Sequence, residues 1–291
     1  MGDELLDSWA LHLRAKNLSA ATLDAYLNDA RHLTGWLDGR PVDTASRRDV
    51  EGFLGDGLAR GLAAATVARR YRSLLQLYRW LLREGEIDTS PMAGMSPPAT
   101  PAQPVPVIPD DILRRLFDAC SGPRFEDKRD MAMLRILATT GVRAGELMGV
   151  DVDDVDLRRG TLTVLGKGRR RRTVELLPKA AEAVDRYVRM RRKHQFTHSP
   201  KLWLGSKGPL STSGLRQLLD RRCQTAGLDP INPHRFRHTF AHVAKMRGMN
   251  DDELMSVAGW TSPQMLTRYG ASAVAERARA AHRRTFEGGE L

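Results

Sequence analysis

The feature that most constrains the fold is a run of prolines that follows the first ninety residues. Between residues 90 and 109 the sequence reads SPMAGMSPPATPAQPVPVIP and holds seven prolines. Proline lacks the backbone N–H and fixes φ, so no helix continues through this segment, and an extended, semi-rigid connector is favoured. With 291 residues the chain is long enough for two separate cores. We therefore predict a first domain at 1–92, a linker at 93–108 and a second domain at 109–291.

The first segment reads as a small helical bundle. From Ser19 to Leu37 apolar residues recur at spacings of three and four, which predicts one buried helical face. A second long helix is predicted from Thr66 to Arg83, ended by Gly85. Shorter helices are expected before Asn17 and between residues 47 and 60. On the second long helix the residues expected to point inward are Val67, Tyr71, Leu74, Leu75, Tyr78, Leu81 and Leu82.

Three arginines, Arg69, Arg72 and Arg79, share the other face of that helix. They either form an ordinary solvated surface or contact DNA phosphates, and we carry both interpretations forward. The net charge bears on this choice, because 46 Lys and Arg residues against 35 Asp and Glu residues leave +11. Such an excess favours a polyanionic partner, and nucleic acid is the most common one.

The second segment is expected to be mainly α-helical with a small β-sheet. Helices are predicted from Pro109 and from Asp130 to Thr139, the latter stopping at Gly141. Between residues 150 and 177 the period changes, because VDVDDVDL, TLTVL and RRTVEL are short, β-branched and separated by RRG and GKG turns. These runs predict a three-stranded antiparallel sheet. From Pro178 the pattern is helical again through Arg284.

Cysteine content and hydropathy indicate the cellular compartment in which the protein works. Cys120 and Cys223 are far apart and lack the paired spacing of a zinc site, so we expect neither a disulfide nor a cysteine-bound metal. No apolar run approaches the length of a membrane-spanning helix, and the first residues do not resemble a signal peptide. We expect a cytoplasmic protein.

Two basic residues stand in turns that suit anion binding. Arg143 follows Gly141 in TTGVRAGEL, where a helix end can present a guanidinium rigidly, although most arginines at helix ends are ordinary surface residues. Lys167 lies between glycines at the expected tip of a hairpin and is followed by Arg169, Arg170, Arg171 and Arg172. That basic stretch either contacts phosphate or forms a charged edge strand. No GxxxxGK[ST] motif is present, so ATP binding is not indicated.

The stretch NPHRFRHTFAHV places His234 and Arg237 on one helical face, within reach of one small group such as a phosphate. A rival reading takes His234, His238 and His242 as zinc ligands. Neighbouring arginines oppose a cation there, and no glutamate follows His234, so we expect His238 and His242 to pack or to support the site. Further on, GWTSPQMLTRYG places Trp260 and Tyr269 on either side of an expected short helix, and Tyr269 is the tyrosine least like a core residue.

Taken in order, TGVRAGEL, GKG, HRFRH and GWTSPQMLTRY resemble the motif series of the tyrosine recombinases, or phage integrases. The segments LSAATLDAYLNDARHL and TVARRYRSLLQLYRWLLREG resemble the family's helical, SAM-like core-binding domain, so the resemblance covers nearly the whole chain. No additional arm-binding domain is visible, as in the short two-domain Xer-type members and compact phage integrases. The resemblance implies a site-specific DNA recombinase with an α+β catalytic domain that needs neither a metal nor ATP.

The resemblance also implies roles for single residues. Tyr269 would attack the scissile phosphate to give a 3′-phosphotyrosine and a free 5′-hydroxyl. Arg143 and Arg237 would hold the non-bridging oxygens, and Lys167 would protonate the departing 5′-oxygen. His234 would assist proton transfer from the tyrosine.

Two further residues complete the implied site. Trp260 stands where many relatives have a second histidine, and its indole N–H would donate to phosphate. Glu146 would orient the arginine or the histidine. The partners implied are duplex DNA core sites and three further copies of the chain, with the segment ASAVAERARAAHRRTFEGGEL docking on a neighbour or folding back on its own subunit.

Other functions remain open at this point. A catalytically inactive DNA-binding protein derived from a recombinase would keep the basic helices but lose members of the site, and none is missing here. A type IB topoisomerase shares the tyrosine chemistry, although the small helical first domain favours recombination. A metal-dependent nuclease would rest on Asp151, Asp153, Asp154 and Asp156, which are more easily read as solvent-facing acids.

Overall fold

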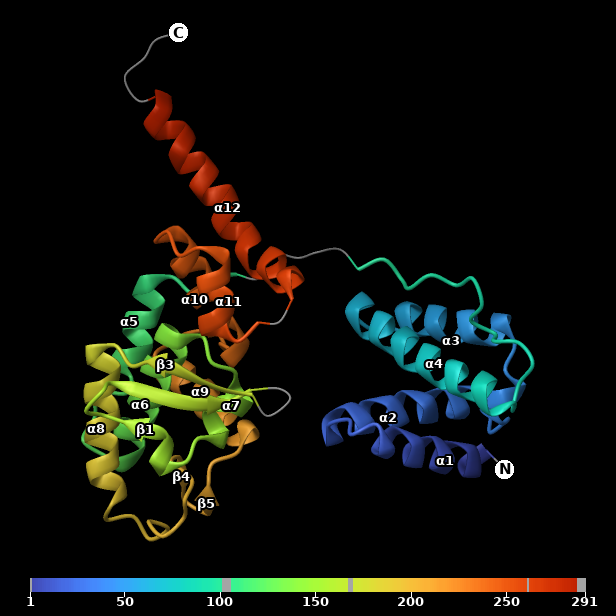
Figure 1. Ribbon diagram of the computed structural model, residues 1–291, viewed down its shortest axis with the longest axis horizontal. Coiled ribbons are helices and arrows are strands. Elements are labelled where there is room, and N and C mark those ends of the chain that lie inside the picture. The colour runs from blue at the N-terminus through green and yellow to red at the C-terminus, as the bar shows by residue number, and fades with distance from the viewer. Residues whose placement is uncertain (1, 101–105, 167–169, 261, 287–291) are drawn as a thin grey trace. The chain divides into compact units, whose positions relative to one another are not determined.

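The computed structural model describes residues 2–100, 106–166, 170–260 and 262–286 (Figure 1). The chain forms two compact units, Met1–Gln103 and Pro104–Leu291, and the division falls within the proline-rich segment. Each unit has a hydrophobic core of its own. No helix in the described part of the chain is long and apolar enough to cross a membrane.

The first unit is a helical bundle, as predicted. Its helices are α1 (Gly2–Ala15), α2 (Ala20–Trp36), α3 (Arg47–Ala59) and α4 (Ala64–Glu84), with a 3₁₀ turn at Val42–Thr44. Ser19 caps α2 by accepting a hydrogen bond from the N–H of Thr22 at 3.2 Å. At the end of α4, Gly85 adopts the left-handed conformation (φ 77°) that favours glycine.

The core of this unit forms where α2 and α3 pack against α4 and α1 packs against α2. Most residues expected to point inward from α4 do so, including Tyr71, Leu74, Tyr78 and Leu81. The prediction was wrong for Leu82, which is 43% exposed. Leu82 lies in the last turn of α4, where the residues that follow it are exposed as well.

The second unit is mainly helical with two small antiparallel sheets. Its elements are α5 (Asp110–Asp118), α6 (Phe125–Thr140), α7 (Ala144–Gly149), β1 (Val155–Asp156), β2 (Thr161–Leu165), β3 (Arg171–Glu175), α8 (Pro178–Arg191), β4 (Leu204–Gly205), β5 (Gly208–Pro209), α9 (Thr212–Thr225), α10 (Pro233–Met246), α11 (Asp251–Ala258) and α12 (Pro263–Phe286). The core lies between α6, α8, α9, α10 and the larger sheet.

The larger sheet has the predicted three antiparallel strands in the order β1-β2-β3. The first strand is much shorter than VDVDDVDL, because Val152–Asp154 forms a 3₁₀ turn. The Asp154 carboxylate accepts the N–H of Asp151 at 3.0 Å, a local side-chain bond that competes with strand pairing. The β4–β5 hairpin was not expected, since strands of two residues carry no readable periodicity.

The last helix also differs from expectation. Instead of a short helix ending before Tyr269, α12 runs without a break from Pro263 to Phe286 and passes through residue 269. Its first part packs against α10 and α11. From Glu276 to Phe286 nearly every side chain is exposed, and Figure 1 shows this part of α12 extending beyond α10 and α11.

Candidate active site

Three consecutive carbonyl oxygens at the end of α11 each accept a hydrogen bond from a different arginine. The pairs are Arg172 Nε to Val257 O at 3.0 Å, Arg237 Nη2 to Ala258 O at 2.7 Å and Arg143 Nη2 to Gly259 O at 3.4 Å. The last carbonyls of a helix lack partners within the helix and carry partial negative charge. This helix end therefore gathers guanidinium groups from three separate elements.

Arg237 lies on α10, whose first turn is fixed by the Asn232 side chain accepting the N–H of Arg235 at 3.1 Å. Although it is charged, Arg237 is only 1% exposed. Its Nη1 donates to Gly141 O at 2.6 Å, so one guanidinium joins the C-terminal ends of α6 and α11. The Trp260 ring lies 5.2 Å from the guanidinium carbon, in a cation–π contact.

Gly141 explains how the chain turns from α6 into Arg143. It has φ 61°, and a Cβ at this position would collide with the Phe240 ring, so both backbone conformation and space require glycine. Two residues later Arg143 is the N-cap of α7. Its N–H donates to Glu146 Oε2 at 2.8 Å, and its Nη1 donates to Glu146 Oε1 at 2.6 Å. The Arg143 side chain is held in place yet 37% exposed.

Glu146 is buried between two arginines. Besides Arg143 it accepts two hydrogen bonds from Arg172, from Nη1 at 3.0 Å and from Nη2 at 2.7 Å. Burial alone would raise the pKa of Glu146, but the hydrogen bonds from Arg172 and from the backbone of Arg143 lower it to about 2. The carboxylate is therefore ionised at neutral pH and fixes both guanidinium groups.

Arg172 departs from expectation. The basic stretch Arg169 to Arg172 is expected either to contact phosphate or to form a charged edge strand, yet the side chain of Arg172 is 14% exposed while that of Arg171 is 67% exposed. Successive side chains of a strand point to opposite faces, and in β3 residue 172 faces inward, opposite Val164 of β2. Arg170 is exposed, and Arg169 lies outside the described residues.

The three histidines of α10 have different surroundings. His234 is exposed in the first turn, and its ring meets that of His238 edge-on at 4.9 Å. His238 and His242 are buried, which agrees with the expectation that they pack. His242 Nε2 lies 3.3 Å from Glu276 Oε2, so α10 and the middle of α12 are joined there.

Trp260 is buried, with an exposure of 5%. It packs with Ala241, Ala244, Leu254 and Ala258 in a small cluster between α10 and α11. Gly259, with φ 62°, turns the chain out of α11 into this position.

For two residues of the implied site, the structure does not describe the side chain. Lys167 lies outside the described residues, between the ends of β2 and β3. Tyr269 lies within α12, and its side chain is outside the description. The described residues that come together are thus Arg143, Glu146, Arg172, Arg237 and Trp260. Of these, Arg172 was not predicted to belong to the site, and only the register of β3 reveals it.

The first unit presents its own basic surface. Arg69 pairs with the fully buried carboxylate of Asp29, whereas Arg72 and Arg79 are exposed.

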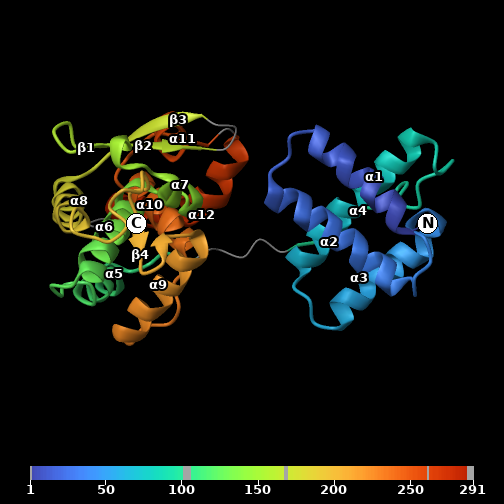
Figure 2. The same cartoon turned by 90° about the horizontal axis from the view of Figure 1, so that it is seen from below.

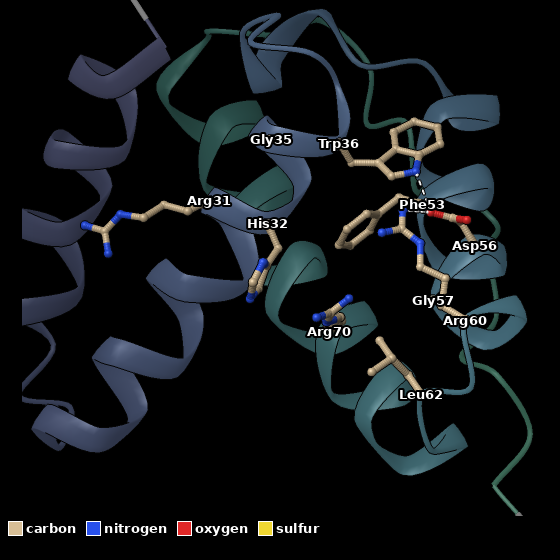
Figure 3. Close-up of a pocket in the computed structure, with 10 residues that line it drawn as sticks. All are labelled: Arg31, His32, Gly35, Trp36, Phe53, Asp56, Gly57, Arg60, Leu62 and Arg70. Atoms are coloured by element: carbon tan, nitrogen blue, oxygen red, sulfur yellow. Dashed lines mark hydrogen bonds and ion pairs between the residues drawn. The ribbon is translucent and has the colours of Figure 1, made fainter.

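A pocket between α2, α3 and α4 was missed by the sequence analysis. It is lined by Arg31, His32, Gly35, Trp36, Phe53, Asp56, Gly57, Arg60, Leu62 and Arg70 (Figure 3). The Arg70 guanidinium carbon lies 5.4 Å from the Phe53 ring, and Trp36 donates to Asp56 at 3.1 Å.

Comparison with known proteins covers both units. The model of the phage integrase family matches residues 106–276, and that of the phage integrase N-terminal SAM-like domain matches residues 6–85. The tyrosine recombinase XerC of Chromohalobacter salexigens is 32% identical over 285 residues, covering 94% of each chain. The tyrosine recombinase XerD of Corynebacterium glutamicum is 32% identical over 301 residues, covering 96% of this chain and 98% of the relative.

Solved structures share the fold at lower identity. The Tn1549 transposon integrase in complex with circular intermediate DNA has a TM-score of 0.75 at 18% identity, over 91% of this chain and 94% of the other. XerH bound to palindromic difH substrate has a TM-score of 0.74 at 17% identity, over 92% of this chain and 81% of the other. By its sequence and both of its domains, the chain belongs to the phage integrase family and is a tyrosine site-specific DNA recombinase.

Proposed function

We propose that this recombinase cuts and rejoins duplex DNA through a 3′-phosphotyrosine at Tyr269. The observation that carries the proposal is the cationic site at the end of α11, where Arg143, Arg172 and Arg237 donate to successive carbonyls and Glu146 accepts hydrogen bonds from Arg143 and Arg172. A phosphate in transfer gains negative charge, and guanidinium groups already fixed in place stabilise that charge without reorganising.

The roles divide according to accessibility. Arg143, which is partly exposed, binds a non-bridging oxygen of the scissile phosphate. Arg237, buried beneath Trp260, adds fixed positive charge and a second donor. The hydroxyl oxygen of Tyr269 forms the new bond to phosphorus while the bond to the 5′-oxygen breaks. Rejoining reverses the step, so the energy of the phosphodiester stays in the phosphotyrosine.

Proton transfer uses two other groups. A phenol is a weak nucleophile at neutral pH, so its proton leaves as attack proceeds, and His234 accepts or relays it. Lys167 gives a proton to the departing 5′-oxygen. His234 stands on the exposed first turn of α10, whereas Lys167 follows β2, so base and acid come from different elements.

DNA binding is assigned to both units. In the first unit the DNA backbone is contacted by Arg72, Arg79 and the rim of the pocket in Figure 3. Arg69 contacts the DNA backbone while it also pairs with Asp29. In the second unit the contacts come from Arg169, Arg170 and Arg171, which follow Lys167 in the chain. All of these contacts are with phosphates, so they set affinity and orientation rather than sequence preference.

Assembly is assigned to α12. The part of α12 that follows Tyr269 carries two large exposed apolar side chains, Val274 at 60% and Phe286 at 48% exposure, among alanines and arginines. We propose that this stretch docks on a neighbouring copy and closes a ring of four subunits on two DNA sites. Truncation after Ser272 is expected to preserve binding of one half-site and to abolish recombination. Recombination at the full-length rate would remove this role.

The central test is covalent trapping on DNA. The probe is a duplex recovered by selecting tight binders from a random library. A nick is placed near the cleavage position, so that the short fragment with the free 5′-hydroxyl diffuses away after cleavage and cannot be rejoined. The wild-type protein is expected to form a denaturation-resistant protein–DNA adduct in the presence of EDTA, and Tyr269→Phe to bind equally well without forming it. An adduct with the Phe variant would overturn the assignment. No adduct with either protein would favour the inactive DNA-binding alternative.

A further inference from the structure

We infer that Arg172 is a positioning residue that sets the segment between β2 and β3, which carries Lys167, against the phosphate site formed by Arg143 and the end of α11. The inference rests on the proposed function, in which Lys167 is the general acid. Arg172 is a residue of β3, which pairs with β2 in an antiparallel hairpin. Arg172 stands opposite Val164, one pair in from the last pair, Leu165 and Arg171. The side chain is therefore anchored near the ends of the two strands that flank Lys167 in the chain.

Each of the three nitrogens of the Arg172 guanidinium donates to one of two elements outside the hairpin. Both terminal nitrogens donate to Glu146 of α7, at 3.0 and 2.7 Å, and Nε donates to Val257 O of α11 at 3.0 Å. Glu146 in turn holds Arg143. Figure 2 shows β3 beside α11, in agreement with the contact between these elements. One side chain thus joins the hairpin to two elements of the phosphate site.

Two glycines show how closely the backbone approaches this ion pair. A Cβ on Gly259, the residue before Trp260, would lie 2.7 Å from Arg172 Nη1 and 2.8 Å from its Cζ. On Gly166, the residue before Lys167, a Cβ would lie 3.5 Å from Arg172 Nη1 and from Glu146 Oε1. The backbone just before Lys167 and the backbone just before Trp260 therefore both lie close to the Arg172 guanidinium.

This arrangement predicts a specific chemical defect. Without Arg172 the end of β3 loses its link to α7 and α11, and in the proposed mechanism Lys167 is then no longer held at a fixed distance from the leaving oxygen. A displacement of about 1 Å is enough to slow a positioned reaction by roughly 10²-fold. Arg143 keeps its own bonds to Glu146 and Gly259, so phosphate binding survives.

The test compares ordinary DNA with DNA that carries sulfur in place of the bridging 5′-oxygen at the cleavage site, because a thiolate leaves without a proton. Cleavage of both nicked duplexes is measured in single turnovers at saturating protein. The proteins are the wild type and the variants Lys167→Ala, Arg172→Ala and Arg172→Gln; the glutamine variant serves if the alanine variant is poorly folded. We expect Arg172→Ala to cleave ordinary DNA about 10²-fold more slowly and the sulfur substrate at close to the wild-type rate.

Arg191→Ala is the matched control. Arg191 is another buried arginine, which donates to the carbonyls of Thr197, Ser199, Lys201 and Leu202, none of them a residue of the proposed site. Loss of a purely structural arginine lowers both rates together and leaves their ratio unchanged.

The outcomes separate the two proposals. If sulfur restores Lys167→Ala but not the Arg172 variants, Arg172 does not act through Lys167 and the inference fails while the proposed function stands. If sulfur does not restore Lys167→Ala, the general acid is another group, and both the role of Lys167 and the inference are overturned.

Discussion

Two clusters of buried charge in the catalytic unit use the same ingredients for different ends. In the first, Arg129 and Arg222 face Asp127 and Asp130, with Nε of Arg222 2.7 Å from Asp130 Oδ2. In the second, Arg143, Arg172 and Arg237 gather at the end of α11 with Glu146 as the carboxylate bound by two of them. The first cluster is balanced, whereas the second holds an excess of positive charge.

The difference follows from what occupies the remaining donors. Arg222 and Arg129 also donate to the carbonyls of Ala119 and Leu204, so the first cluster ties α6 and α9 to the end of α5 and to β4. In the second cluster the carbonyls belong to two helix ends, whose partial charge holds the arginines without neutralising them. A neutral buried cluster serves structure, and a cationic one is ready for an anion.

The largest expected effect tests the balanced cluster. Arg222→Ala leaves Asp127 and Asp130 buried with fewer partners, and breaking a buried ion pair in this way costs about 3–5 kcal/mol. We expect a matching loss in the free energy of unfolding, measured by urea titration, while the protein that remains folded cleaves DNA normally. Arg186→Ala, at an exposed pair with Glu182, is the control. A loss below about 1 kcal/mol would place Arg222 with the surface pairs.

The cationic cluster should show the reverse pattern. Arg143→Ala and Arg237→Ala each remove a charged donor from the transferring phosphate, and loss of even a neutral donor commonly slows such reactions by about 10²- to 10³-fold. Single-turnover cleavage of the nicked duplex is the measurement. For Arg143→Ala we expect little change in stability, since its side chain is partly exposed. Losses under about tenfold at both positions would contradict the proposed phosphate site.

How far the sequence predicts these clusters depends on how local their signals are. Gly141, Gly85 and the spacing of His234 and Arg237 are local signals, and the structure places helix ends and a shared helix there. The run Arg169 to Arg172 gives four identical residues, and only strand register shows that one of them turns inward. The partners of that residue, Glu146 and Val257, are 26 and 85 positions away in the chain.

Local signals also misled in two places. Alternating acids in VDVDDVDL suggested a strand, but their side chains bond to nearby backbone and favour a turn. The sequence predicted that a short helix ends before Tyr269, yet α12 continues through Tyr269 and Gly270. A glycine within a helix costs only about 1 kcal/mol relative to alanine, and packing of α12 on α10 offsets such a cost.

A smaller effect concerns the pH dependence of Glu146. Its pKa in the folded protein, about 2, lies below the ordinary value of 4.5. The ionised carboxylate therefore stabilises the fold above about pH 4.5, and this contribution is lost as the pH falls toward 2. We expect the stability advantage of the wild type over Glu146→Gln to shrink by about 1 kcal/mol between pH 7 and pH 4. Glu175→Gln, at an exposed position of β3, controls for removal of a carboxylate. A difference that is constant with pH would mean that Glu146 is not held ionised by its arginines.

The smallest effect on stability is expected at Arg171, which is adjacent to Arg172 yet exposed and paired with Asp154 at 2.6 Å. Exposed pairs contribute about 0.2–1 kcal/mol, so Arg171→Ala should leave unfolding nearly unchanged. If its guanidinium contacts a DNA phosphate, the variant releases one counterion fewer on binding. The slope of log K against log salt should then be shallower by about 0.9 for Arg171→Ala, measured between roughly 50 and 200 mM salt. Arg186→Ala, which also removes an exposed arginine from an ion pair, is expected to leave the slope unchanged. Equal slopes for wild type and Arg171→Ala would show that Arg171 only pairs with Asp154. In that case neither neighbour in the pair Arg171 and Arg172 would touch DNA, and binding by this hairpin would fall to Arg169 and Arg170.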